Sequence, residues 1–155
     1  MRTMRSVVAD TLGEPSEVLH LQTRPLPEPG PGQVRIRVTA VPVHASDLHT
    51  IRGRYGFTPE FPTLPVIESV GLFADLGSGT DGLTVGQCVI TIGVTGTWQE
   101  YLVADAGRVL PVPAGPCSSA TRLSDIMSRA SNCSSVSALM RASASQASDT
   151  EAATR

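Results

Sequence analysis

The stretch Q-V-R-I-R-V-T-A-V-P-V, residues 33–43, carries the clearest structural signal in the chain. Apolar and polar side chains alternate along it, with Val34, Ile36 and Val38 on one face and Arg35, Arg37 and Thr39 on the other. This period of two is typical of a half-buried β-strand. The sequence therefore predicts a strand whose valine and isoleucine side faces the core.

Short β-prone runs of the same kind make up most of the chain before about residue 115. They lie at residues 6–10, 19–23, 66–76, 87–92, 97–104 and 109–113, and glycine-rich or proline-rich turns separate them. Residues 25–32 contain too many prolines for a central strand, because proline has no amide to donate to a sheet. The pattern predicts a mainly β fold, a barrel or a sandwich, in which the first two runs pair as a hairpin.

A short helix is predicted directly after the first strand described. Ser46 can cap its first turn, Asp47 lies favourably at the positive end of the helix dipole, and Gly53 can adopt the left-handed conformation that ends a helix. Tyr55 follows on a loop anchored by this helix, so its phenol can reach a neighbouring cleft. Tyr55 is the candidate catalytic residue, although a loop tyrosine more often only packs against the core.

The composition changes beyond residue 115. Residues 116–155 are dominated by serine and alanine, with too few large apolar side chains for a packed core. An apolar spacing of three and four residues would allow one amphipathic helix over residues 120–129. We therefore divide the chain into a folded domain, residues 1–115, and a poorly structured tail, residues 116–155.

Charge and hydropathy exclude some classes of function. The net charge of −2 gives no basic face for nucleic acid, and no apolar run reaches the roughly 20 residues that cross a bilayer. The first ten residues lack a signal-peptide core, so we expect a cytoplasmic protein. Cys88, Cys117 and Cys133 form no C-x-x-C pair, and we expect unpaired thiols in a reducing compartment.

Two polar patterns have a structural and a functional interpretation. The run G-S-G-T-D-G at residues 77–82 matches the dinucleotide motif G-x-G-x-x-G, but β-branched residues follow it where a helix should begin, which favours a β-turn. His44, Asp47 and His49 are types that bind zinc, yet on one short helix they point in different directions, which favours a polar helix edge.

Glu68 interrupts an apolar strand, and the sequence leaves its orientation open. Turned inward, its carboxylate would need a partner, for which Arg52 and Arg54 are candidates. Turned outward, it would simply be solvated.

Five segments together resemble a known family. They are P-L-P-E-P-G-P-G-Q-V-R-I-R-V, S-D-L-H-T-I-R-G-R-Y-G, E-S-V-G, L-T-V-G-Q and G-T-W-Q-E-Y-L-V, and they span residues 4–115. In order and spacing they resemble the N-terminal half of medium-chain dehydrogenases/reductases, closest to the zinc-independent quinone and 2-enoyl thioester reductases. The resemblance implies a GroES-like, partly open β-barrel with short helices.

The resemblance also implies a site. In the enoyl reductase branch a tyrosine in the loop after S-D takes part in catalysis, and Tyr55 matches it. Trp98 would lie near the substrate and nicotinamide, with His44 and Asp47 at the same cleft. Zinc-dependent relatives carry a cysteine at the position of His44 and Gly-His-Glu at residues 66–68, so the resemblance implies no metal. The usual asparagine near residue 44 is also absent.

The implied function is NADPH-dependent reduction of an activated C=C bond or a quinone, with a small-molecule substrate and, in full-length relatives, a homodimer. Family members continue into a Rossmann domain that binds NADPH, which residues 116–155 do not resemble. The alternative is therefore an inactive fragment or interaction module of the same fold. A zinc-dependent alcohol dehydrogenase is a third and weaker hypothesis.

We predict that limited proteolysis cuts first beyond residue 116 and leaves a resistant core of roughly residues 4–115. The serine-rich and alanine-rich segment lacks the apolar density that protects a backbone from proteases. Mass spectrometry of the fragments checks this boundary, and early cleavage within residues 33–43 would contradict it.

Overall fold

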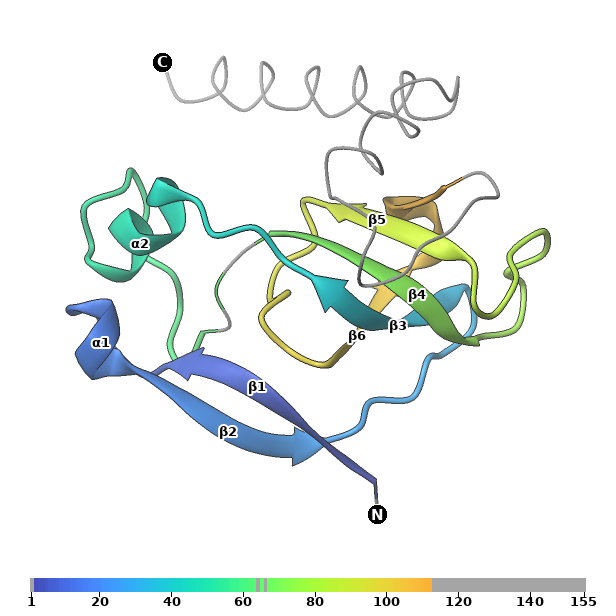
Figure 1. Cartoon of the computed structure of the whole chain (residues 1–155), viewed down its shortest axis with the longest axis horizontal. Coiled ribbons are helices and arrows are strands. Elements are labelled where there is room, and N and C mark those ends of the chain that lie inside the picture. Colours follow the sequence, from blue (N-terminus) through green and yellow to red (C-terminus); the bar gives the residue numbers. More distant parts are fainter. Residues whose placement is uncertain (1, 64, 66, 113–155) are drawn as a thin grey trace.

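The computed structural model describes residues 2–63, 65 and 67–112 as a mainly β structure, as the sequence predicts. Its elements in chain order are β1 (Thr3–Ala9), α1 (Pro15–Val18), β2 (Leu19–Pro25), β3 (Gln33–Ala40), α2 (Ala45–Ile51), β4 (Glu68–Leu76), β5 (Cys88–Ile92), β6 (Tyr101–Asp105), the 3-10 turn η1 (Ala106–Arg108) and β7 (Val109–Pro111). The strands form a two-stranded sheet, β1-β2, and a curled five-stranded sheet in the order β6-β3-β4-β5-β7. Figure 1 shows the smaller sheet lying along the larger one, with α1 and α2 at one end.

The strand predicted from residues 33–43 is confirmed as β3, and it lies inside the larger sheet. It pairs antiparallel with β4 on one side and with β6 on the other. Val34 and Ile36 are fully buried, in one cluster with Phe73 of β4, Val89 of β5 and Leu102 of β6. The valine and isoleucine side therefore faces the core, as the alternation predicts.

The predicted hairpin of the first two runs is also confirmed. β1 and β2 pair antiparallel from Thr3 with Pro25 to Ala9 with Leu19, and α1 lies in the connection between them. The second edge of β1 connects the two sheets, because the Val7 amide donates to the Trp98 carbonyl at 2.8 Å and the Ala9 amide to the Thr63 carbonyl at 2.9 Å. These contacts close one side of the partly open barrel.

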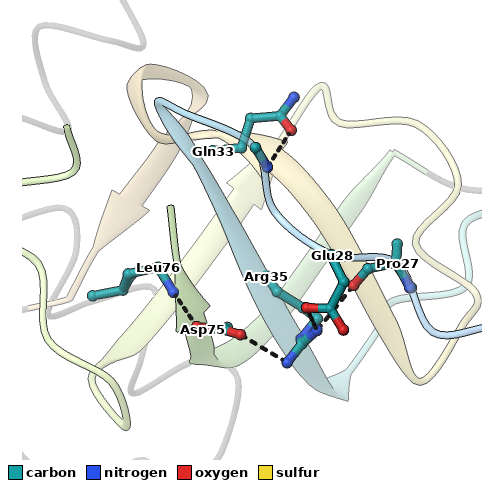
Figure 2. A network of polar contacts seen from close by, with 7 residues as sticks. Pro27, Glu28, Gln33, Arg35, Asp75 and Leu76 are labelled. Atoms are coloured by element: carbon teal, nitrogen blue, oxygen red, sulfur yellow. Dashed lines mark hydrogen bonds and ion pairs between the residues drawn. The ribbon is translucent and has the colours of Figure 1, made fainter. Parts of the chain in front are cut away.

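Arg35 is buried, although it lies on the polar face of β3. Its side chain is only 7% exposed; Nη1 donates to the Pro27 carbonyl at 3.0 Å and to Glu28 Oε2 at 2.7 Å, and Nη2 donates to Asp75 Oδ2 at 3.0 Å. Figure 2 shows the guanidinium between the proline-rich connection and β4. Arg35 thus fastens residues 25–32, which lack the amides for a strand, to the sheet.

The G-x-G-x-x-G run is a turn between β4 and β5, as predicted, and contains no helix. Gly79 and Gly82 have φ of 78° and 83°, a conformation that favours glycine. A side chain at Gly77 would place its Cβ 1.9 Å from the Gly30 carbonyl oxygen. The glycines are therefore explained by backbone geometry and by close packing against the proline-rich connection.

Several details differ from the sequence predictions. The last predicted long strand begins at Tyr101, four residues later than expected, because residues 97–100 bond to β1.

Cys88 is disulfide-bonded, so the expectation of three unpaired thiols is wrong. Cys117, Cys133 and the predicted tail and helix lie outside the described residues. Neither α-helix of the described part is long and apolar enough to cross a membrane.

We predict that Arg35→Ala lowers the free energy of unfolding by about 1 to 3 kcal/mol, because it removes three charge-assisted hydrogen bonds while two carboxylates stay near water. Urea denaturation measures the change. Arg37→Ala is the matched control, since Arg37 is exposed on the same face of the same strand, and its effect should stay within about 0.5 kcal/mol. Equal effects of the two substitutions would contradict the role of Arg35 in fastening residues 25–32 to the sheet.

Candidate functional site

The helix before the candidate tyrosine begins earlier than the sequence predicts. α2 starts at Ala45 with His44 as N-cap, so the expectation that Ser46 caps the helix is wrong. The reason lies with Asp47, the third helical residue, whose Oδ2 accepts from the His44 amide at 2.7 Å. A carboxylate at this position that reaches back to the N-cap amide stabilises a helix start. Asp47 therefore has a local structural role.

The end of α2 is as predicted. Gly53 has φ of 69°, its amide donates to the Thr50 carbonyl at 3.0 Å, and the Arg54 amide donates to the His49 carbonyl at 2.8 Å. These two bonds form a Schellman motif, which ends the helix and turns the chain sharply. Tyr55 follows at once, so its position is defined by the helix end.

The Tyr55 side chain is available for chemistry. It is 50% exposed, and its ring meets the ring of Phe57 edge-on, with centroids 6.3 Å apart and planes at 76°. Within the described residues the phenol hydroxyl has no hydrogen-bond partner. A phenol without an internal partner is free to donate to a bound molecule.

Tyr55 lines a cavity of about 200 Å³, which we call the Tyr55 cavity. Its walls come from α2, from the loop after α2 and from the segment after β5, and comprise Ser46, Asp47, Thr50, Ile51, Tyr55, Phe57, Pro59, Thr63, Pro65, Ile67 and Thr95. Phe57, Pro59, Thr63 and Pro65 of the loop after α2 thus line a cleft. Tyr55, Phe57 and Ile67 are each about half exposed, so large apolar side chains gather at this cavity.

Trp98 lines a different, larger depression of about 410 Å³, which we call the Trp98 groove. The groove lies between the two sheets and is lined by Arg5, Ser6, Val7, Leu21, Val38, Val41, Val43, Thr97, Trp98, Gln99 and Glu100. Thr95 lines the Tyr55 cavity and Thr97 lines the groove, so the segment between β5 and β6 borders both. The structure therefore does not bring Tyr55 and Trp98 into one cavity.

His44 pairs with the carboxylate whose orientation the sequence left open. His44 Nε2 lies 3.3 Å from Glu68 Oε2, and both side chains are about half exposed. Arg52 instead pairs with Glu14 at 2.9 Å, so it is not the partner of Glu68. The start of α2 approaches β4, whereas its end approaches α1, which the sequence could not reveal. His44 lines neither of the two cavities.

The metal hypothesis gains no geometric support from the described part of the chain. There, no three histidine, cysteine, aspartate or glutamate side chains come together as a metal site would require. Asp47 already holds the start of α2, while His49 lies in the last turn of the same helix. Asp47 and His49 therefore lie in the first and last turns of α2.

An ion pair forms the rim of the Trp98 groove. Arg5 Nε donates to Glu100 Oε1 at 2.8 Å, and the Arg5 amide donates to Glu100 Oε2, also at 2.8 Å. The hydrogen bond from the Arg5 side chain is the main reason why the pKa of Glu100 lies below its ordinary value, and the same contact raises the pKa of Arg5. The pair joins β1 to the segment before β6.

The family of the chain follows from residues 30–114, which match the alcohol dehydrogenase GroES-like domain. The chain belongs to this family, and within it to the medium-chain dehydrogenases/reductases of the zinc-independent branch. The expectation from the sequence motifs is thereby confirmed, and so is the GroES-like fold.

Three relatives illustrate the similarity. The mitochondrial enoyl-[acyl-carrier-protein] reductase of Homo sapiens is 33% identical over 122 residues, which are 77% of this chain and 33% of that protein. A Bacillus thuringiensis protein assigned as an NADPH:quinone reductase is 27% identical with a TM-score of 0.67, over 73% of this chain and 34% of that one. A mycobacterial protein solved with NADPH is 26% identical with a TM-score of 0.63, over 77% and 38%. The chain spans about a third of the length of the curated relatives it matches.

We predict that the carboxyl group of Glu100 titrates below the ordinary glutamate pKa in the folded protein, and that Arg5→Ala raises this pKa part of the way back, because the backbone amide of residue 5 still donates to the carboxylate. A folded-state pKa that is lowered adds stability above the unfolded value, and this stability is lost as the pH falls through the folded pKa. A ¹³C NMR titration of the carboxyl carbon measures both midpoints. Arg2→Ala, at an exposed neighbouring arginine, should leave the Glu100 midpoint where it is.

Proposed function

We propose that this chain provides the substrate-binding domain of an NADPH-dependent, zinc-independent reductase of an activated C=C bond, such as a 2-enoyl thioester, or of a quinone. The observation that carries the proposal is the half-exposed phenol of Tyr55, which has no hydrogen-bond partner in the described part of the chain and lines a largely apolar cavity. The family, and relatives that include enoyl and quinone reductases, support the same class of reaction.

Tyr55 would act on the oxygen of the substrate. Reduction of a C=C bond conjugated to a carbonyl places negative charge on the carbonyl oxygen, and a quinone oxygen gains charge in the same way. A phenol within hydrogen-bond distance stabilises that charge or delivers a proton, an effect on the order of 10² to 10³ in rate for a well-placed donor. Phe57, Ile67 and the prolines of the cavity would keep water away from the reacting atoms.

NADPH would supply the hydride when bound, but the described residues do not fit its pyrophosphate. The one G-x-G-x-x-G run is a turn without a following helix, and Gly77 is packed against Gly30. A dinucleotide-binding unit needs its glycines at the start of a helix, where backbone amides meet the phosphates. In the whole protein we assign that task to a Rossmann domain, as in the family.

We further propose a small-molecule substrate, a homodimer as the resemblance implies for full-length relatives, and the cytoplasm as the compartment. We propose no metal, because the pairing of His44 with Glu68 and of Asp47 with the helix start uses the groups that a metal would need.

A module without activity of its own is the second candidate. The observation that favours it is the Trp98 groove, where Leu21 and Val43 are 70% and 62% exposed, a surface that suits contact with another protein segment. The two candidates differ in their expected turnover. The reductase requires cofactor-dependent turnover that depends on Tyr55, whereas a module without activity shows none.

We predict that the 155-residue chain alone does not oxidise NADPH with quinones or 2-enoyl thioesters, and that fusion of a Rossmann domain of the family after residue 113 brings activity. The reason is that proximity, worth roughly 7 to 11 kcal/mol of barrier, requires a cofactor in a fixed position. In the active fusion, Tyr55→Phe should lower kcat at least about tenfold. NADPH absorbance measures each rate.

Tyr101→Phe is the matched control, since Tyr101 is the second tyrosine of the chain and lies in β6 away from the cavity. Its kcat should equal that of the unmodified fusion. An unchanged kcat in Tyr55→Phe would remove the phenol from the mechanism, and turnover by the unfused chain would show that it holds NADPH by itself.

A further inference from the structure

We propose that the Tyr55 cavity accepts a short, neutral alkyl group of the substrate, and that Phe57 limits the length of that group. The inference rests on the proposed function, which places the reacting carbonyl at Tyr55. It adds a substrate class and a residue that determines specificity.

The size of the cavity supports a short group. At about 200 Å³ it is smaller than the roughly 300 to 1,000 Å³ of pockets that enclose drug-sized ligands. An apolar cavity of about 150 Å³ binds one benzene molecule. The Tyr55 cavity therefore has space for about six to eight carbon or oxygen atoms, which corresponds to the carbonyl group and an alkyl chain of a few carbons.

The charge of the cavity supports a neutral group. Asp47 is the one charged side chain among the lining residues, and its carboxylate is held by the His44 amide. A ligand with its own carboxylate inside the cavity would meet a like charge there, which disfavours binding. Esters, thioesters, amides and ketones avoid this repulsion, whereas free acids do not.

Phe57 is the residue that can set the length limit. Its ring lines the same cavity of about 200 Å³ and stands edge-on against the ring of Tyr55, with centroids 6.3 Å apart, so it takes up space that the alkyl group would otherwise fill. It is also 60% exposed, which means that truncation removes little buried surface. Phe57→Ala should therefore enlarge the cavity and leave the fold intact.

Binding of substrate analogues to the 155-residue chain tests the inference without any turnover. The probes are saturated N-acetylcysteamine thioesters with acyl chains of four to twelve carbons, observed by saturation-transfer NMR. We expect affinity to be highest at about four to six carbons and to fall about tenfold or more once the chain exceeds the cavity. Phe57→Ala should move the maximum to longer chains, and Phe57→Trp should move it to shorter ones.

Three comparisons complete the design. Val85→Ala removes an equally exposed apolar side chain outside both cavities and should leave the length profile unchanged. Leu21→Ala alters the Trp98 groove and should also have no effect. Hexanoate should bind more weakly than hexanamide, with a smaller gap in Asp47→Asn.

The inference fails if no probe binds, if affinity rises steadily with chain length in both the unmodified protein and Phe57→Ala, or if Leu21→Ala abolishes binding. A length limit without turnover in the Rossmann fusion would overturn the proposed function and leave the cavity assignment in place. Turnover in the fusion without a length limit would overturn the cavity assignment and leave the proposed function in place.

Discussion

The burial of β3 between β4 and β6 is the constraint on which the rest of the structure depends. Its apolar side places Val34 and Ile36 in the core, and its polar side buries Arg35 against two carboxylates. The buried guanidinium is tolerated because Nη1 and Nη2 donate to two carboxylates and one carbonyl, and the two carboxylates stay partly exposed, which lowers their own cost of desolvation. The same strand thus holds the core on one face and the proline-rich connection on the other.

The position of β3 also determines where the candidate site lies. β3 leads directly into α2, whose start is held by Asp47 and whose end is determined by the left-handed Gly53. Tyr55 follows Gly53 by only two residues, so the helix end restricts where its backbone can lie. A side chain placed directly after a helix end is positioned at low entropic cost. Residues of the loop that follows line the Tyr55 cavity together with residues of α2.

The two depressions have different characters. The Tyr55 cavity is small and is lined by hydroxyl, apolar and aromatic side chains and by the carboxylate of Asp47, and within the described residues its phenol has no hydrogen-bond partner. The Trp98 groove is larger and contains five aliphatic side chains, with the Arg5 and Glu100 pair at its rim. Trp98 lines this groove, and its buried indole nitrogen has no hydrogen-bond partner within the described residues.

The sequence by itself determined the features that depend on neighbours along the chain. The alternation of β3, the hairpin of β1 and β2, the turn at residues 77–82 and the end of α2 at Gly53 all follow from local backbone geometry and side-chain period. The tertiary structure alone decided the burial of Arg35, the pairing of His44 with Glu68 and the separation of Tyr55 from Trp98. The contacts of His44 with Glu68 and of Arg35 with Asp75 join residues 24 and 40 positions apart, and Tyr55 and Trp98 fall into different cavities. No local pattern specifies which distant residues meet and which stay apart.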